Sequence, residues 1–269
     1  MKKTKPLIGI SGCLLGQAVR YNKGNTHDKW ITNELSKYVD FYPICPEVEM
    51  GLGTPREEIH LYYTEQDKKE IKLRSKFTRK ELTSLANETY EKMNKKSDEA
   101  QIDGYILMKK SPSCGLGNVK TVSEDEKGNV KLLPGLYANN LERRYPDIPK
   151  QDSGRMKNDL LREQFIQTVY AHYRFSQLDG SMKSLRDFQK KYKYILMEHS
   201  QNKMRQLGGM AANLENLLAV LRDYKAGLSG YMIPVNLISF FIKKNKVEYL
   251  MEQYYFDPYP KELKLSKVL

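Results

Sequence analysis

Three short apolar runs, each followed by a cysteine beside Gly or Pro, constrain this 269-residue chain more than any other feature. They read PLIGISGC, YVDFYPIC and GYILMKKSPSC, and they end at Cys13, Cys45 and Cys114, the three cysteines of the sequence. Nearly continuous apolar runs of this length are typical of strands that are buried on both faces of a sheet. We therefore expect three central strands, each with a cysteine past its carboxyl end.

Helical patterns separate these runs. Residues Lys29–Val39 and Thr78–Lys96 are amphipathic, and in the second segment apolar or small residues recur every three or four positions. The order strand, helix, strand, helix, strand is typical of a parallel sheet in an α/β domain. We predict a Rossmann-like α/β domain with a mainly parallel sheet over residues 1–155.

Parallel topology has a consequence for the cysteines. The carboxyl ends of parallel strands lie at one edge of a sheet, and ligands bind outside that edge. Cys13, Cys45 and Cys114 are far apart in the sequence, yet this topology brings them to the same rim. The sequence therefore predicts a site built from three thiols.

The second half has a different pattern. Residues 134–158 are rich in Pro, Gly and Asn and are typical of a linker. Beyond them, Asn158 or Asp159 is a candidate cap for LLREQFIQTVYAHYRFSQL, and three further helical segments follow. We predict an all-α helical bundle of about five helices over residues 156–269.

The net charge of +12 points to a polyanionic partner. Residues 151–269 alone hold 19 Lys and Arg against 12 Asp and Glu. Such an excess favours nucleic acid before an anionic membrane surface. The longest apolar run, VNLISFFI, is far shorter than the roughly 18 residues of a membrane span. The apolar patch PLIGI is also too short for a signal sequence, so we expect a cytoplasmic protein with reduced thiols and no membrane contact.

Three interpretations of the cysteines are open from the residues alone. Cysteines are often buried as small apolar residues. Three thiolates also form a zinc site with an open position or hold an iron–sulfur cluster from separate loops. No CxxC pair is present, and the four histidines form no HxxxH pair.

The motifs GISGCLLGQAVRYNKG, CPEVEMGLGTPRE and SPSCG, in this order, closely resemble the bacterial thiouracil desulfidase family. The segments LLREQFIQTVYAHYRFSQLDG and LMEHSQNKMRQLG resemble the helical domain that is fused to it in tRNA 4-thiouridine desulfidases. The resemblance implies an α/β domain that binds a [4Fe-4S] cluster through Cys13, Cys45 and Cys114. It further implies that Glu47 is the catalytic acid or base and that Ser113 is the catalytic serine.

The implied roles suit the chemistry of these residues. An iron without a protein ligand accepts the sulfur of a thiocarbonyl, so water can add at C4 and sulfide can leave without net electron transfer. Glu47 is placed to take the proton of that water, and a serine hydroxyl to bind the base or the oxyanion. From the residues alone, Glu49 competes with Glu47, and Ser111 competes with Ser113.

Basic residues near the motifs and in the second half are candidates for RNA binding. Arg20 and Tyr21 are placed to bind a phosphate or stack on a base, while Asn22 departs from the Asp usual in the family. Aromatic residues in the second half are better explained by helix packing. The exposed cations expected to contact an RNA backbone are Lys190, Lys191, Lys193, Lys203 and Arg205.

These observations lead to one leading hypothesis and two alternatives. We expect an enzyme that removes sulfur from 4-thiouridine in tRNA, giving uridine and sulfide, after extrusion of the nucleotide. The first alternative is the same chemistry on free thiolated nucleobases such as 4-thiouracil. The second is a non-enzymatic RNA-binding module with a structural metal site.

Overall fold

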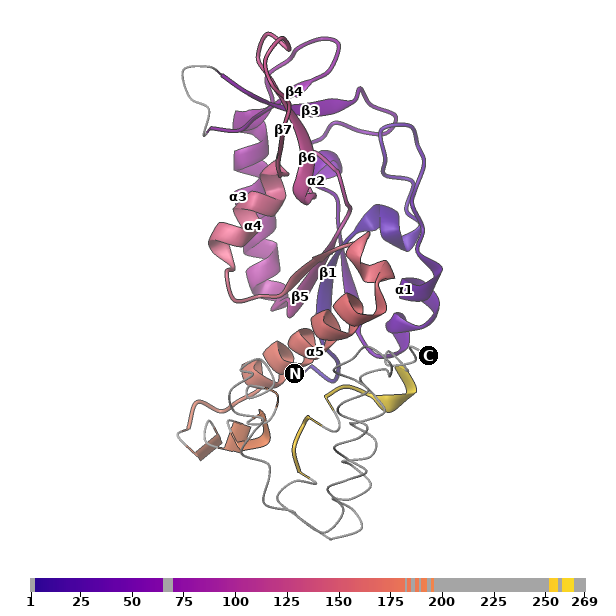
Figure 1. The fold of residues 1–269 in the computed structure, drawn as a ribbon, viewed down its shortest axis with the longest axis vertical. Helices are drawn as coiled ribbons and strands as arrows, with labels where there is room; N and C mark the ends of the chain where they lie inside the picture. The colour runs from indigo at the N-terminus through magenta and orange to yellow at the C-terminus, as the bar shows by residue number, and fades with distance from the viewer. Residues whose placement is uncertain are drawn as a thin grey trace, which may run out of the picture. The chain divides into compact units, whose positions relative to one another are not determined.

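The computed structural model of the protein contains two compact units, Met1–Tyr173 and Arg174–Leu269 (Figure 1). It describes residues 3–64 and 70–181 and, beyond them, residues 183, 184, 187, 188, 190–192, 195, 252–255 and 258–263. Most described residues therefore belong to the first unit. Within the described part of the chain, none of the helices has the length and apolar character needed to cross a membrane.

The first unit contains a four-stranded sheet, sheet A, in the order β2-β1-β5-β8. All of its neighbouring strands are parallel, which confirms the predicted parallel sheet. The predicted apolar runs form its first three strands, and β1 occupies a central position. Its strands are β1 (Leu7–Ser11), β2 (Asp40–Ile44), β5 (Gly104–Leu107) and β8 (Lys150–Asp152).

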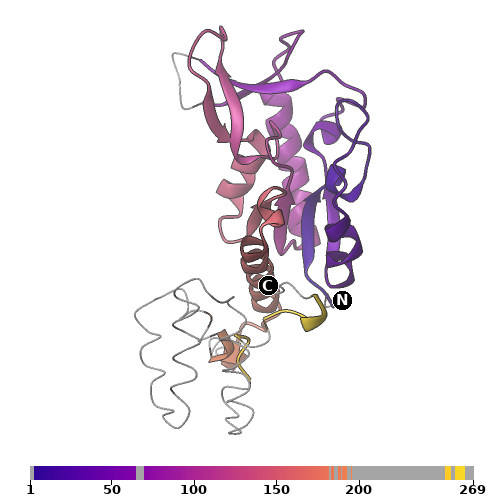
Figure 2. The same cartoon turned by 45° about the vertical axis from the view of Figure 1, so that its right-hand side comes forward.

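Alternation along the strands decides which helices cover each face of sheet A. A Cβ atom on Gly9 would lie 2.6 Å from the Tyr105 ring, so Gly9 leaves room for Tyr105 on the face that packs against α3 and α4. On the other face, a Cβ atom on Gly104 would lie 2.6 Å from Val169 of α5. Helices α3 (Thr83–Ala100) and α4 (Leu136–Arg144) lie side by side in Figures 1 and 2, and α5 (Asp159–Ser176) crosses the opposite side.

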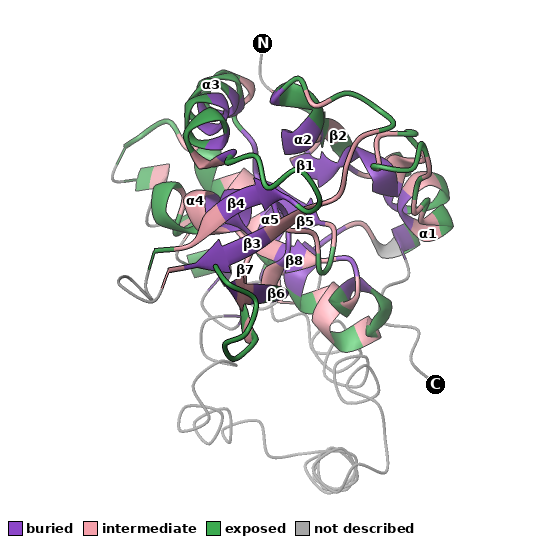
Figure 3. Ribbon diagram, turned by 90° about the horizontal axis from the view of Figure 1, so that it is seen from above, coloured by how far each residue is buried: buried purple, intermediate pink, exposed green. Residues whose placement is uncertain are grey.

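A second sheet, sheet B, was not predicted from the sequence. Its order is β4-β3-β6-β7, and it is mixed, because β3 pairs with β6 in parallel while the outer pairs are antiparallel. Leu61, Leu73 and Val119 of this sheet belong to the same hydrophobic cluster as Tyr105. Figure 3 shows the buried central strands and the exposed outer faces of the helices. The strands are β3 (Ile59–Tyr63), β4 (Lys72–Ser75), β6 (Leu116–Ser123) and β7 (Lys131–Pro134).

The predicted helices of the first half are present, with different ends. The segment Lys29–Val39 forms α1 (Lys29–Asn33), which Asp28 caps through bonds from the amides of Trp30 and Ile31, and then a 3-10 turn. The segment expected from Thr78 begins as a helix only at Thr83, because β4 precedes it and the amide of Thr78 is bonded to Glu57. The short helices are α2 (Pro46–Glu49), η1 (Gly12–Leu15), η2 (Leu35–Lys37), η3 (Arg155–Lys157) and η6 (Lys261–Leu263).

The interpretation of residues 134–158 as a linker was wrong. This segment contains α4, and its last residues form β8, which pairs in parallel with β5. Leu136, Tyr137 and Leu141 are buried in the main hydrophobic cluster. Pro and Asn therefore mark the short turns around these elements, and the segment belongs to the α/β fold.

Helix α5 was assigned to the second domain in the sequence, and its first turn is capped as expected, with the amide of Leu161 donating to Asn158 at 3.0 Å. In the structure its residues up to Tyr173 belong to the first compact unit. The other helices of the expected all-α bundle lie mostly outside the described residues. The boundary at residues 155 and 156 and the bundle itself stay predictions.

Candidate active site

One cavity of about 390 Å³ brings the three cysteines together at the carboxyl edge of sheet A. Cys13 follows β1, Cys45 follows β2, and Cys114 lies on the turn after β5. These strands are adjacent and parallel. The side chains of Cys13 and Cys114 are buried, and that of Cys45 is partly exposed. The predicted convergence of three thiols at one rim is therefore present in the structure.

A tight turn presents Cys13. The strand β1 ends at Ser11, and η1 reverses the chain until Gly16, whose φ of 89° lies in the left-handed region that glycine adopts freely. The carbonyl of Cys13 accepts bonds from the amides of Gly16 and Thr26, at 3.3 and 3.0 Å. The backbone at Cys13 is thus fixed from both sides.

Cys45 and Glu47 are placed together by the start of α2. Pro46 occupies the first helical position, where its fixed φ suits the helix and its missing N–H costs nothing. The Cys45 Sγ lies 3.5 Å from the Oε2 of Glu47, and Glu47 is 7% exposed. Glu49, the rival carboxylate, points away and forms an ion pair with Lys96 at 3.0 Å. Geometry therefore favours Glu47 as the carboxylate of the site.

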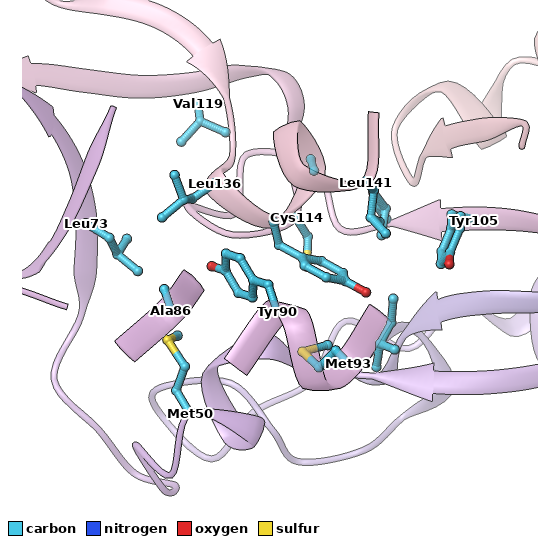
Figure 4. Packing of buried hydrophobic residues seen from close by; sticks show 14 of the residues in the cluster. Met50, Leu73, Ala86, Tyr90, Met93, Tyr105, Cys114, Val119, Leu136 and Leu141 are labelled. Atoms are coloured by element: carbon cyan, nitrogen blue, oxygen red, sulfur yellow. The ribbon is translucent and has the colours of Figure 1, made fainter. Parts of the chain in front are cut away.

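The turn KKSPSCGLG is organised by Ser111. Its Oγ accepts bonds from the amides of Ser113 and Cys114, at 3.2 and 3.1 Å. Gly115 is required at its position, since a Cβ atom there would lie 2.4 Å from Val119 and 3.0 Å from the Ser111 carbonyl. Together these contacts hold Cys114 toward the cavity. The thiol of Cys114 also belongs to the core cluster that contains Tyr90, as Figure 4 shows.

The two serines of this turn have different surroundings. Ser111 lines the cavity, and its Oγ lies 3.5 Å from the Oε1 of Glu47. Ser113 is fully buried and does not line the cavity. Its Oγ and the nearby Tyr90 hydroxyl make no hydrogen bond of acceptable geometry among the described residues. The cavity thus contains Ser111, the alternative that the sequence left open.

Burial keeps all three thiols protonated while no metal is bound. Desolvation, followed by the negative charge of Glu47, raises the pKa of Cys45 to about 12. The same two causes raise the pKa of Cys114 well above its usual range. Burial is also the largest cause of the raised pKa of Cys13. Thiolates in such a place need a cation to stabilise them, so metal binding would displace protons.

The arrangement of the donors distinguishes the metal sites considered above. Among the described residues, no three His, Cys, Asp or Glu side chains are close enough to hold one metal ion together. Three thiols that share a cavity at larger separation suit a group wider than a single ion, such as a four-iron cluster. Cys13, Cys45 and Cys114 therefore fit an iron–sulfur cluster better than a three-cysteine zinc site.

Basic side chains also line the cavity. Arg20 and Tyr21 do so as expected, with the Arg20 guanidinium 6.0 Å from the centre of the Tyr21 ring. Asn22 has a turn role, because its Oδ1 accepts a bond from the amide of Gly24 at 3.0 Å. The sequence analysis missed Lys109 and Lys110, although both begin the cysteine turn, and it also missed Arg56.

The other candidates lie elsewhere. His27, His60 and His172 do not line the cavity, and His199 lies outside the described residues. Lys190 is exposed, and Lys191 is half-buried with its Nζ 5.7 Å from the centre of the Tyr254 ring. Lys193, Lys203 and Arg205 lie outside the described residues. The proposed RNA-binding patch therefore stays a prediction.

Comparison with known proteins gave two family matches and one solved structure. Residues 8–153, more than half of the chain, match the family described as 2-thiouracil desulfurase. Residues 215–260 match a family described as a protein of unknown function, DUF1722. A solved chain named [4Fe-4S]-dependent thiouracil desulfidase TudS aligns over 60% of this chain and 99% of its own, with 23% identity and a TM-score of 0.45. Among curated proteins, none matches the sequence.

Proposed function

The chain belongs to the 2-thiouracil desulfurase family, and from this premise we propose that it uses a [4Fe-4S] cluster to remove sulfur from 4-thiouridine in tRNA. The products are uridine and sulfide. In this proposal Cys13, Cys45 and Cys114 are the ligands of the cluster. The enzyme works in the cytoplasm, where its thiols are kept reduced.

One observation carries this proposal above the others. Three thiols from three separate strand ends line a single cavity that also holds a buried carboxylate, Glu47. A non-catalytic structural site needs ligands only, and it has no use for a desolvated carboxylate with no ion-pair partner among the described residues. Groups of this kind gather where chemistry occurs.

The bound cluster supplies a thiophilic Lewis acid for the sulfur of the substrate. Glu47 takes a proton from the water that adds at C4, and its position 3.5 Å from both the Cys45 Sγ and the Ser111 Oγ directs it into the cavity. The C4–O bond forms, the C4–S bond breaks, and the proton leaves with the sulfide. No electron is gained or lost by the substrate.

Ser111 has two tasks in this proposal. Its Oγ holds the amides of Ser113 and Cys114, and so fixes the turn. The same hydroxyl faces Glu47 and is placed to donate a hydrogen bond to the carboxylate or to the oxygen that develops on C4. The role given to Ser113 by family resemblance remains a prediction, and the geometry favours Ser111.

Support for tRNA as the substrate comes from the second half of the chain. Residues 151–269 carry an excess of seven positive charges, 19 Lys and Arg against 12 Asp and Glu. Such an excess suits a nucleic acid backbone. A free base needs no such domain, so the rival substrate, 4-thiouracil, leaves this half of the protein without a role.

The proposal is tested on the full chain, purified and reconstituted with iron and sulfide without oxygen. We expect a brown protein that releases sulfide from thiolated tRNA faster than from 4-thiouracil. Cys45→Ala should lose iron and activity together, while Glu47→Gln should keep its iron and lose activity by at least about 100-fold. The matched control Glu49→Gln, at the surface pair with Lys96, should keep both.

Other outcomes would decide for the rivals. Faster release from 4-thiouracil than from tRNA would identify a free-base desulfidase. A colourless zinc protein that binds tRNA but releases no sulfide would contradict the enzyme proposal altogether.

A further inference from the structure

Three cations line the active-site cavity without an ion-pair partner among the described residues. They are Arg20, Lys109 and Lys110. The two lysines are exposed, and Arg20 is half-buried. Their contacts in this part of the chain are with aromatic or backbone groups, such as the Tyr21 ring under Arg20. They therefore contribute positive charge to the cavity that no described carboxylate neutralises.

The acidic residues that line the same cavity are engaged elsewhere. Glu57 accepts bonds from the amide of Thr78 at 2.7 Å and from its hydroxyl at 2.8 Å, and these bonds lower the pKa of Glu57. Glu58 forms an ion pair with Lys76 at 2.6 Å. The remaining cation of the lining, Arg56, is bonded to the carbonyls of Val19 and Gly53. Charge is thus unbalanced only at the other three cations.

Backbone contacts fix where these cations stand. The amide of Lys109 donates to the Oγ of Ser153 at 3.2 Å, which ties the start of the cysteine turn to the residue after β8. Lys110 has a φ of 59°, in the left-handed region that costs a residue with a side chain energy. Arg20 begins a turn that is closed by a bond from its amide to the Gly24 carbonyl at 3.2 Å. All three therefore occupy set positions around the cavity.

The thiols do not account for all of this charge. Arg20 interacts with Cys13, whose pKa it lowers, so part of its charge serves the ligands. The lysines are exposed and stand on the solvent side of the buried thiol of Cys114. An anion that enters from solvent meets them before it reaches the thiols.

We propose that Lys109, Lys110 and Arg20 bind the phosphate of a thiolated nucleotide, so that this site selects nucleotides over free bases. The inference rests on the proposed function for the identity of the base. Lysine ammonium groups bind phosphate as point charges, and arginine adds directed hydrogen bonds. The phosphate belongs either to a mononucleotide or to the backbone of an RNA strand.

The test uses the full, cluster-loaded protein and two substrates, 4-thiouracil and 4-thiouridine 5′-monophosphate. The variants are Lys109→Gln with Lys110→Asn, where Asn tolerates the left-handed backbone, and Arg20→Gln alone. We expect each to lower the ratio of kcat/KM for the nucleotide over kcat/KM for the base by about tenfold or more, mainly through KM. The control Lys92→Gln with Lys95→Gln removes two exposed lysines of α3 that do not line the cavity and should leave the ratio unchanged.

A second measurement needs no turnover. Calorimetry should show that uridine 5′-monophosphate binds the protein more tightly than uridine does, and that the lysine variants remove this difference. Equal binding of the two ligands, or an unchanged substrate ratio in the variants, would overturn the inference while leaving desulfuration of 4-thiouracil intact. Lysine-dependent binding of the monophosphate by a protein that releases no sulfide would support the phosphate site and contradict the proposed function.

Thiolated tRNA separates the two sources of phosphate. A loss on tRNA as large as that on the mononucleotide would identify the phosphate beside the target base in an RNA strand. A loss on the mononucleotide alone would identify free nucleotides as the ligands of this site.

Discussion

Ser111 illustrates how one small side chain connects the local turn to the chemistry of the cavity. Its hydroxyl accepts two backbone amides of the turn and faces Glu47. Ser113, two residues later, is fully buried and makes no such contacts. A hydroxyl acts on a substrate only when it reaches the space that the substrate occupies, and that condition separates the two serines.

The serines are distinguished by two alanine variants. Ser111→Ala should lower kcat for sulfide release by about 100-fold, because it removes a hydrogen bond at the reacting centre. Ser113→Ala should change kcat by less than about threefold, since its hydroxyl has no described partner to lose. Iron content is measured in both variants. An iron-replete Ser113→Ala protein without activity would return the catalytic role to Ser113.

At the scale of elements, the start of α4 supports the cysteine turn. Gly135 precedes α4, and a Cβ atom there would lie 2.5 Å from the carbonyl oxygen of Ser113. The amides of Leu136 and Ala138 donate to the carbonyls of Pro112 and Ser113, each at 2.9 Å. The segment that the sequence presented as a linker thus holds a ligand loop of the site in place.

Gly135→Ala should therefore destabilise the protein by about 1 to 3 kcal/mol and lower its iron content after reconstitution. The matched control is Gly104→Ala, whose new methyl would meet Val169 of α5 at a comparable 2.6 Å but far from the turn. Urea unfolding and iron analysis are measured on both. Equal iron content in the two variants at equal loss of stability would show that the turn does not depend on Gly135.

Sheet B contains an element-scale response to pH. The Nε of the buried Arg74 donates to the Nε2 of His60 at 2.9 Å, so the fold favours the neutral imidazole. Burial, and then the charge of Arg74, lower the pKa of His60. A lowered pKa means that the contribution to stability is full above the unfolded value of about 6.5 and is lost as the pH falls below it.

We expect the free energy of unfolding to fall between about pH 7.5 and about pH 5.5, and to fall less in His60→Gln, whose amide oxygen still accepts from Arg74. Chemical denaturation at several pH values measures this. A variant with the same slope as the wild-type protein would show that other groups cause the pH dependence.

At the scale of the whole molecule, α5 is bound to the α/β unit by polar contacts as well as by its apolar face. The hydroxyls of Tyr170 and Tyr173 donate to the carbonyls of Tyr38 and Lys3, at 2.9 and 2.6 Å. Asp103 pairs with both Lys3 and His172. Burial alone would raise the pKa of Asp103, but bonds from His172, Lys3 and the Leu7 amide outweigh it and lower the pKa.

A chain that ends after Gly180 should keep these contacts and the whole cavity. We expect it to release sulfide from 4-thiouracil at a rate within about threefold of the full chain, while its KM for thiolated tRNA rises by about tenfold or more because basic residues are lost. Circular dichroism and iron content check that the shortened chain is folded. Undiminished activity on tRNA would place all of the RNA contacts in the first 180 residues.

The sequence by itself determined the parallel strands, the convergence of the cysteines and the family, because each depends on local runs of residues and on the common direction of strand ends. It did not determine sheet B or β8, whose strands are specified by pairing with distant partners. Nor did it decide between Glu47 and Glu49 or between Ser111 and Ser113, since neighbours in sequence differ only in which side of a turn they face. The tertiary structure decided these points, because only packing determines which side chains line the cavity and which are buried behind it.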